Sequence, residues 1–174
     1  MPIEIRRVTN CEDVEAITAL VHAAYAPHVA DGLRFWGTHQ SVDDTVRRLA
    51  SGAAFVAVEN ARYIGVVVVR PPQPSSPVPL YQEPNVWSIS QFCVAPEHKG
   101  AGLGRKLHEV AVEYARNQCA KFLSLDTAAP AKKLIELYER WGYSIVGSCD
   151  WRPHTNYVSV LMKRPIEALV NREA

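Results

Sequence analysis

The chain is poor in cysteine, and the cysteines that it has lie far apart. Its 174 residues include four, Cys11, Cys93, Cys119 and Cys149. No C-x-x-C pair occurs among them. The sequence therefore predicts neither a zinc site nor a disulfide framework, and no metal is expected. We interpret the four side chains as small buried hydrophobic groups.

Long apolar runs and an excess of one charge are also missing. No stretch approaches the roughly 18 to 20 apolar residues of a membrane-spanning helix, and no apolar segment follows the charged start of the chain. We therefore expect a cytoplasmic protein without a membrane partner. The formal net charge is +1, from 19 Lys and Arg against 18 Asp and Glu, which gives no general reason to expect nucleic acid binding.

The overall composition is that of an ordinary globular protein. Hydrophobic residues make up 48% and charged residues 21% of the chain. A chain of this length can bury a sizeable core, and residues 1–174 are expected to form one domain.

Hydrophobic periodicity divides the chain into strands and helices. Strands are predicted over 3–8, 53–59, 63–70, 87–94, 121–126, 143–149 and 157–162. Helices are predicted over about 14–27, 42–49, 103–118 and 131–141, with Pro27 ending or kinking the first one. The segment 71–79 holds five prolines and is expected to be an extended loop. The order β-α-α-β-β-β-α-β-α-β-β predicts an α/β fold, a mixed sheet with helices on both faces.

The most informative segment runs from Phe92 to Leu107, where a strand, a proline turn and three alternate glycines lead into a helix. Glycines let the backbone approach a bulky anion, and the first turn of a helix offers unpaired N–H groups. Lys99, Arg105 and Lys106 add positive charge at the same place. The segment therefore predicts a phosphate-binding turn.

Two common phosphate loops do not fit this segment. A nucleoside triphosphatase loop requires Lys-Ser or Lys-Thr after its glycines, and neither pair is present here. The dinucleotide pattern G-x-G-x-x-G would place its third glycine at the position of Arg105.

The stretch V-A-P-E-H-K-G-A-G-L-G-R-K-L resembles the acetyl-coenzyme A (acetyl-CoA) motif of the GNAT superfamily of N-acetyltransferases. Lys99 stands where the family pattern [QR]-x-x-G-x-[GA] has Gln or Arg. A second stretch, L-I-E-L-Y-E-R-W-G-Y over 134–143, is similar to the family's L-Y-x-x-x-G-[FY] helix end. The resemblance covers about residues 3–163.

The resemblance implies a mixed α/β fold of the GNAT type and acetyl-CoA as co-substrate. The strand before the glycine turn would be bulged and would splay from its neighbour, and the backbone of Phe92, Cys93 and Val94 would bind the pantetheine arm. An N–H near Val94 would polarise the thioester carbonyl. The pyrophosphate would be held by Lys99, Gly100, Ala101, Gly102, Leu103, Gly104 and Arg105.

Tyr138 is the candidate catalytic residue. The departing thiolate needs a proton, and a phenol with a pKa of about 10 can supply it. The alternative is a core aromatic side chain on an amphipathic helix; the match to the family's helix end favours the general acid.

The sequence does not single out one residue as the general base. Gln91 stands where many relatives carry a Glu, and an amide cannot accept the proton. The candidates are a water chain, Asp126, His98, His154, and His28 or His39 of the early loop. A second departure is Ala131, at a position where many relatives carry an Asn that contacts the coenzyme.

Acceptor selection in this superfamily commonly involves the first helices, the loop between them and the last strand pair. The candidate acceptor-binding residues carry rings or hydrogen-bonding groups, and they are Tyr25, His28, Arg34, Asp126, His154 and Asn156. They suit a small polar amine or a peptide amine, and Arg34 could hold a carboxylate. Asp126 either lines the cleft or caps the turn at Thr127. Trp36 is expected to belong to a small core that closes this end.

The leading hypothesis is an acetyl-CoA-dependent N-acetyltransferase in which an amine attacks directly within a ternary complex. A covalent route through Cys93 is the chemical alternative. Two further readings are a CoA-binding sensor or partner-binding module without catalysis, and an acyltransferase that uses a longer acyl-CoA. The final strands could also pair across a homodimer, as they do in many relatives.

Overall fold

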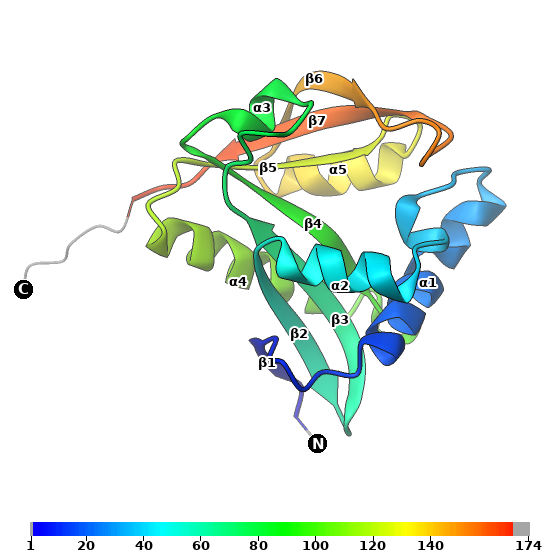
Figure 1. Ribbon diagram of the computed structural model, residues 1–174. Coiled ribbons are helices and arrows are strands. Elements are labelled where there is room, and N and C mark those ends of the chain that lie inside the picture. The colour runs from blue at the N-terminus through cyan, green and yellow to red at the C-terminus, as the bar shows by residue number, and fades with distance from the viewer. Residues whose placement is uncertain (1, 169–174) are drawn as a thin grey trace, which may run out of the picture.

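The computed structural model describes residues 2–168, which form a seven-stranded mixed sheet with helices on both faces. Figure 1 shows α1 (Val14–Ala30) and α2 (Val42–Ala50) in front of the sheet, and α4 (Leu103–Asn117) and α5 (Lys132–Arg140) behind it. The mixed α/β fold predicted from the sequence is confirmed, with the predicted order of main elements.

The strands follow the order β1-β2-β3-β4-β5-β7-β6 across the sheet. Every neighbouring pair is antiparallel except β4 and β5, which are parallel. The strands are β1 (Glu4–Arg7), β2 (Ala53–Glu59), β3 (Arg62–Arg70), β4 (Val86–Val94), β5 (Phe122–Ala128), β6 (Ser144–Asp150) and β7 (Val158–Pro165). The short helices are η1 (Trp36–Thr38), α3 (Pro79–Gln82) and η2 (Pro96–His98).

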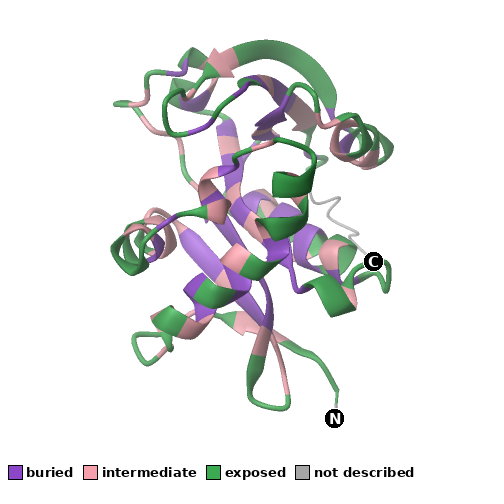
Figure 2. Cartoon of the chain, turned by 90° about the vertical axis from the view of Figure 1, so that its right-hand side faces the viewer, coloured by how far each residue is buried: buried purple, intermediate pink, exposed green. Residues whose placement is uncertain are grey.

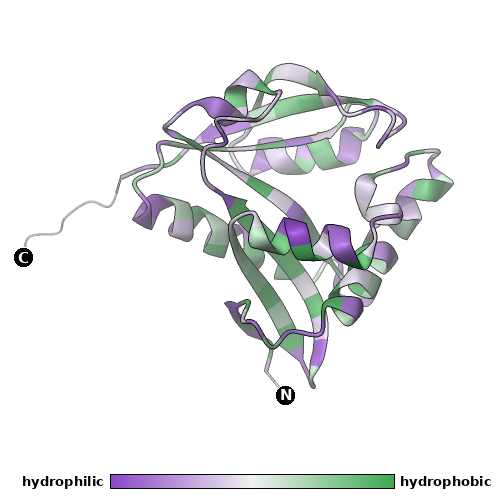
Figure 3. Cartoon of the chain, in the orientation of Figure 1, coloured by the Kyte–Doolittle hydropathy of each residue, from purple (hydrophilic) through white to green (hydrophobic). Residues whose placement is uncertain are grey.

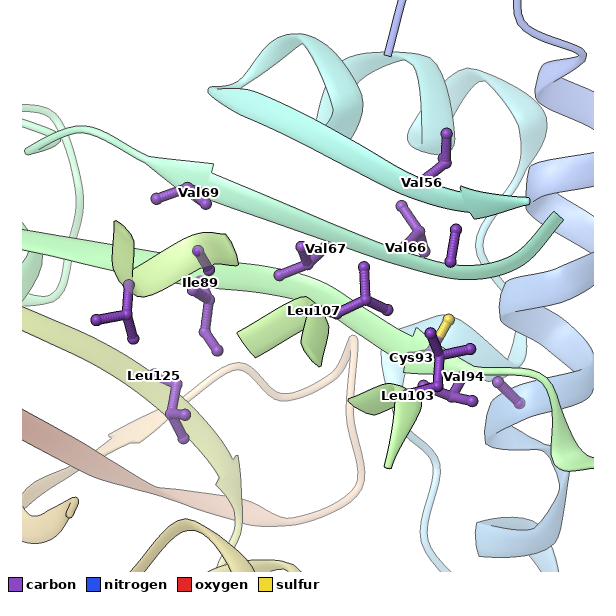
Figure 4. Packing of buried hydrophobic residues seen from close by; sticks show 14 of the residues in the cluster. Val56, Val66, Val67, Val69, Ile89, Cys93, Val94, Leu103, Leu107 and Leu125 are labelled. Carbon is purple, nitrogen blue, oxygen red and sulfur yellow. The ribbon is translucent and has the colours of Figure 1, made fainter. Parts of the chain in front are cut away.

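The core lies on both faces of the central strands. Four consecutive residues of β3, Val66 to Val69, have no exposed surface, because helices cover the sheet on both sides there. Figure 2 shows this burial along the middle of the sheet, and Figure 3 shows the same strands as hydrophobic. In Figure 4, Leu107 of α4 packs among the side chains of the central strands.

β4 separates from β5 after a short stretch of pairing, and this separation creates the site. The two strands pair only from Val86 to Ser88 on β4 and from Phe122 to Ser124 on β5. Farther along, β4 carries a bulge against β3, where the register shifts between Val66 and Val68 and Gln91 has φ +49°. Figure 1 shows the two strands diverging beyond this point. The bulge and the splay agree with what the family resemblance implied.

Several local predictions differ from the structure. Helix α1 continues through Pro27 to Ala30, although the proline cannot donate the helical hydrogen bond. The proline-rich segment is not loop throughout, since Pro79 occupies the first turn of α3, where a missing N–H costs nothing. Cys93 is buried and Cys149 half-buried, but Cys11 and Cys119 are exposed, so the prediction of four buried cysteines is wrong for two of them.

Candidate active site

A cavity of about 780 Å³ opens where β4 and β5 diverge. It runs from the glycine turn, past the bulged end of β4, to the side chains at the end of β5. The cavity is lined at one end by Lys99, Gly100, Gly102, Gly104 and Arg105, and at the other by Arg48, Arg70, Tyr81, Asp126 and Trp151. Tyr138 of α5 also lines it.

The glycine turn leaves the start of α4 open. Gly100 and Gly102 both have φ +83°, a left-handed conformation that favours glycine, and a Cβ at either position would meet no atom within 4 Å. Gly102 is the N-cap of α4, and no side chain caps the helix. The first N–H groups of α4 therefore face the turn without a side-chain acceptor, at the positive end of the helix dipole.

Eight of the ten residues predicted to bind the coenzyme line this cavity. Ala101 and Leu103 do not line it, since Ala101 is exposed and the Leu103 side chain is 3% exposed in the core. Lys99 Nζ donates to the Ala24 carbonyl oxygen at 3.0 Å. Arg105 lies on the surface beside Glu109, with Nε 3.4 Å from a carboxylate oxygen.

The end of β4 is anchored from helix α1. The hydroxyl of Tyr25, a predicted acceptor-binding residue, donates to the Phe92 carbonyl oxygen at 2.8 Å. Tyr25 also lines the cavity and contacts the ring of Phe35. Tyr25 thus holds the strand edge that the resemblance assigns to the pantetheine arm.

Tyr138 and Cys93 face the middle of the cavity with protonated side chains. Burial raises the pKa of the Tyr138 hydroxyl well above its usual value, so the phenol keeps its proton. Burial also raises the pKa of the Cys93 thiol to about 12. Figure 4 shows Cys93 within the packed core beside Val94 and Leu103. A thiol with that pKa carries almost no thiolate at neutral pH, so it is a poor nucleophile.

Asp126 lies at the inner end of the cavity, at the end of β5. Its carboxylate accepts a hydrogen bond from the Tyr81 hydroxyl at 2.6 Å and another from Trp151 Nε1 at 3.0 Å. The side chain is half-buried, because one side faces the cavity while protein surrounds the rest. Burial raises the pKa of Asp126 above 3.8, although the two hydrogen bonds and the charges of Arg48 and Arg70 act in the opposite direction.

The sequence reasoning missed three of the residues around Asp126, namely Arg48, Arg70 and Tyr81. Arg48 shares a face of α2 with the buried Thr45, three residues earlier, and Arg70 follows the run of buried valines in β3. In both cases a charged residue stands next to residues expected to be buried, and this pattern could have marked the two arginines as site candidates. Tyr81 had no comparable signal, because it follows the proline-rich segment and reaches the site through the fold of α3.

The other predicted acceptor-binding residues divide into two groups. His28 lines the cavity, where its ring lies 4.5 Å from the ring of Phe35 and burial lowers its pKa. Arg34, His154 and Asn156 do not line the cavity; they connect two loops at its rim. Asn156 accepts from the Arg34 backbone N–H at 2.8 Å and donates to the Gly32 carbonyl oxygen at 2.9 Å.

Of the remaining candidates for the general base, one lines the cavity and two do not. His98 lines the cavity, with Nε2 3.0 Å from a Glu59 carboxylate oxygen. His39 and His154 lie outside the cavity lining, and the ring of each lies near that of Trp36, with centroids 6.3 Å and 4.2 Å away respectively. Trp36 lines the cavity, but the small hydrophobic core beside it consists of Phe35, Ala128 and Tyr157 without Trp36, so the expectation that Trp36 belongs to that core is wrong.

Two kinds of feature are absent from residues 2–168, a metal-binding cluster and a membrane-spanning helix. Within residues 2–168, no group of three or more His, Cys, Asp or Glu side chains is placed to hold a metal ion. In the same part of the chain, no helix has the length and apolar character needed to cross a membrane.

Comparisons with known proteins identify the family. The model of the acetyltransferase (GNAT) family matches residues 18–143. S-(2-succino)cysteine N-acetyltransferase from Bacillus subtilis (strain 168) is 32% identical over 156 residues, which cover 88% of this chain and 91% of that protein. S-alkylcysteine N-acetyltransferase from the same strain is 26% identical over 148 residues, which cover 83% of this chain and 81% of that protein.

Solved structures share the fold at lower identity. A GNAT family acetyltransferase from Elizabethkingia anophelis, with acetyl-CoA bound, is 18% identical and superposes with a TM-score of 0.66, covering 94% of this chain and 97% of that one. The matched family model covers the glycine turn, the bulged strand and Tyr138 alike. The chain therefore belongs to the GNAT family of acetyltransferases and is an acetyl-CoA-dependent N-acetyltransferase.

Proposed function

We propose that the acceptor is the amine of a small amino acid of the S-substituted cysteine type. The observation that carries this proposal is Asp126, a half-buried carboxylate at the inner end of the cavity that begins at the glycine turn. A carboxylate there suits an ammonium group that must lose a proton. The two relatives named above act, by their names, on S-(2-succino)cysteine and S-alkylcysteine.

The residues of the cavity fit acetyl-CoA. Gly100 and Gly102 leave open space where side chains would stand, and the uncapped start of α4 suits a diphosphate. Beyond Ser88, the edge of β4 that faces β5 has no strand partner, so its backbone groups, apart from the Phe92 carbonyl oxygen that accepts from Tyr25, can pair with the amide-bearing pantetheine arm. Acetyl-CoA, when bound, supplies the activated acetyl group.

The side chains in the cavity support direct transfer. Asp126 accepts a proton from the acceptor's ammonium group, which leaves the amine free to attack the thioester carbonyl. Tyr138, kept protonated by burial, gives its proton to the departing thiolate, and the second proton that the nitrogen loses as the amide forms restores the Tyr138 hydroxyl. Cys93 takes no part as a nucleophile, because its raised pKa keeps the thiol protonated.

The rim of the cavity favours a small acceptor over a protein chain. The loop after α1 and the loop between β6 and β7 are joined through Asn156, which bonds Gly32 and Arg34. Trp36 and His154, one from each loop, lie with ring centroids 4.2 Å apart. These contacts hold the two loops together at the rim, which suits a small acceptor better than a long chain.

A thiol-release assay tests the proposed function. The enzyme would be given acetyl-CoA with S-methylcysteine, S-(2-succino)cysteine, other amino acids, polyamines, aminoglycosides and short peptides. We expect the S-substituted cysteines to give the highest kcat/KM. Faster turnover of peptides or polyamines than of any amino acid would overturn the proposal. Propionyl-CoA and succinyl-CoA in the same assay measure the acyl preference.

A homodimer through the last strands stays a prediction. Strand β6 is the edge of the sheet, and Ile145 and Val146 on it are each nearly half exposed. An edge strand with exposed apolar side chains can pair with a second copy. Light scattering coupled to size-exclusion chromatography measures the mass directly, and a mass of 19.3 kDa would rule the dimer out.

A further inference from the structure

Three buried polar atoms without a hydrogen-bond partner belong to residues that line one end of the cavity. Among the described residues, Arg70 Nε, Ser90 Oγ and Gln91 Nε2 have no partner. Gln91 is 2% exposed, and its carbonyl oxygen already accepts from Gln40 Nε2 at 2.9 Å. A buried donor without a partner is costly, so a site that gathers several of them is suited to a ligand rich in acceptors.

The backbone places these donors side by side. In the register between β3 and β4, Arg70 lies opposite Ser88 and Val68 lies opposite Ser90, so Arg70 shares a face with both serines. The bulge at Gln91 brings the next side chain into the same region. Arg48 reaches the same cavity from α2 and donates to Gln40 Oε1 at 3.0 Å.

The two guanidinium groups carry charge that the protein does not neutralise by direct pairing. In the part of the chain that the structure describes, neither Arg48 nor Arg70 has a carboxylate oxygen within 4.0 Å. Each is held instead by a neutral glutamine oxygen, from Gln40 and Gln73 respectively. Asp126 is the carboxylate that acts on both from a greater distance. Two positive charges against one negative leave this end of the cavity electropositive.

We propose that Arg48 and Arg70, together with Ser90 and Gln91, bind the free α-carboxylate of the acceptor while Asp126 receives its amine. This inference rests on the proposed function. The amine and the carboxylate of an α-amino acid are bonded to the same carbon, which matches a site where Asp126 stands near both guanidinium groups. A peptide N-terminus carries a neutral amide in place of that carboxylate and would leave the two charges unpaired.

The first experiment compares matched acceptors. The kcat/KM of the wild-type enzyme is measured with S-methylcysteine, with its α-carboxamide and with S-methylcysteamine, which lacks the carboxylate. We expect the two analogues without a carboxylate to be at least 100-fold poorer. Equal kcat/KM for the amino acid and its amide would overturn the proposal.

The second experiment removes the arginines. Arg70→Met and Arg48→Met should each lower kcat/KM for the amino acid by about 100-fold while changing that for the amide by less than about threefold, with the Kd for CoA unchanged. Arg70→Lys should recover part of the loss. Arg47→Met is the matched control, because Arg47 neighbours Arg48 on α2 but is exposed and pairs with Asp44 on the surface. An equal loss with both acceptors would assign the arginines a structural role and reject the proposal.

A binding measurement separates this inference from the proposed function. Calorimetry of the CoA complex with S-methylcysteine and with its amide needs no turnover. Binding of the amino acid but not the amide, lost in Arg70→Met, supports the carboxylate site even if cysteine conjugates prove to be poor substrates. Equal binding of the two ligands, or binding of neither, rejects it.

Discussion

Asp126 is bound by two neutral donors rather than by an arginine, and this choice of partners decides its chemistry. Direct pairing with a guanidinium group would lower the pKa of the carboxylate and make it a poor proton acceptor. Tyr81 and Trp151 hold the carboxylate in place, while burial keeps its pKa above the ordinary value. Arg48 and Arg70 stay far enough away to remain available for a ligand.

Replacing Asp126 by Asn should lower kcat by about 100-fold, because the amide cannot accept the proton of the ammonium group. The pH profile provides a second readout. Asp126 works only when ionised, so kcat of the wild type falls as the pH drops through its pKa, and the raised pKa moves that fall to a pH above 3.8. Asp126→Asn should lose this acidic limb.

The control for that experiment is Asp43→Asn, an exposed acid at the start of α2. It should leave the profile unchanged. An Asp126→Asn enzyme that keeps the wild-type limb would exclude Asp126 as the base and return the role to His98 or to water.

Tyr138→Phe should lower kcat roughly 10- to 100-fold and leave the Kd for CoA unchanged, since only the hydroxyl is removed from a side chain that also packs on Trp141 and Tyr143. Stopped-flow measurement of thiol release gives kcat, and calorimetry gives the Kd. Unchanged kcat between pH 6 and pH 9 would exclude the hydroxyl as the general acid.

The glycine turn and the start of α4 act as one element. Gly102 is both the last residue of the turn and the N-cap of the helix, it has φ +83°, and both Gly102 and Gly104 line the cavity. Any other residue at position 102 would have a strained backbone, and its side chain would enter the open space beside the start of α4.

Gly102→Ala should therefore weaken CoA binding by at least tenfold and reduce the free energy of unfolding by about 1–2 kcal/mol. Gly32→Ala separates the loss of CoA binding from the loss of stability. Gly32 has a similar φ of +74°, and an added Cβ there would also meet no atom within 4 Å. Gly32, however, lies in the loop after α1 and not in the glycine turn. The control should lose similar stability in a urea titration and keep the Kd for CoA. Equal Kd values for the two variants would show that the turn does not hold the coenzyme.

The glycine turn and the helix after it could be predicted from the sequence because local chemistry determines them. Alternate glycines after a strand require a left-handed turn, and the helix that follows shows a clear period. Asp126 could be predicted as a candidate site residue, but the group of side chains around it could not. Asp126, Tyr81 and Arg48 come from β5, α3 and α2, and only the divergence of β4 from β5 brings them to one cavity. That divergence depends on a bulge at Gln91, a residue that no turn rule marks.

Three rim residues were predicted as acceptor-binding groups from their residue type and from the segments that the family resemblance implies. Arg34, His154 and Asn156 carry polar groups of the expected kind, on the expected loops. In the structure these side chains make contacts between the loops. Asn156 in particular accepts from the Arg34 backbone N–H and donates to the Gly32 carbonyl oxygen. Composition indicates which loops meet at a site, but the direction of each side chain depends on packing that the sequence alone does not show.

At the scale of the whole molecule, the divergence of β4 and β5 divides the sheet into β1–β4 and β5–β7, joined by three paired positions. A hydrophobic core nevertheless spans the division, from Val66 of β3 through Leu107 of α4 to Met162 of β7. The two halves should therefore unfold together, and a ligand inserted between β4 and β5 should stabilise both at once.

Thermal unfolding should accordingly show a single transition, with the same midpoint by circular dichroism and by tryptophan fluorescence. Acetyl-CoA at about 100 times its Kd adds roughly 2.7 kcal/mol to the free energy of unfolding, which for a chain of this size raises Tm by about 5–10 °C. Adenosine alone, which lacks the diphosphate and the pantetheine arm, should shift Tm by less than about 1 °C at the same concentration. Two separate transitions in the free protein, with only one of them shifted by acetyl-CoA, would contradict the expectation of a single domain. They would mean that the shared core does not couple the two halves of the sheet on either side of the cavity.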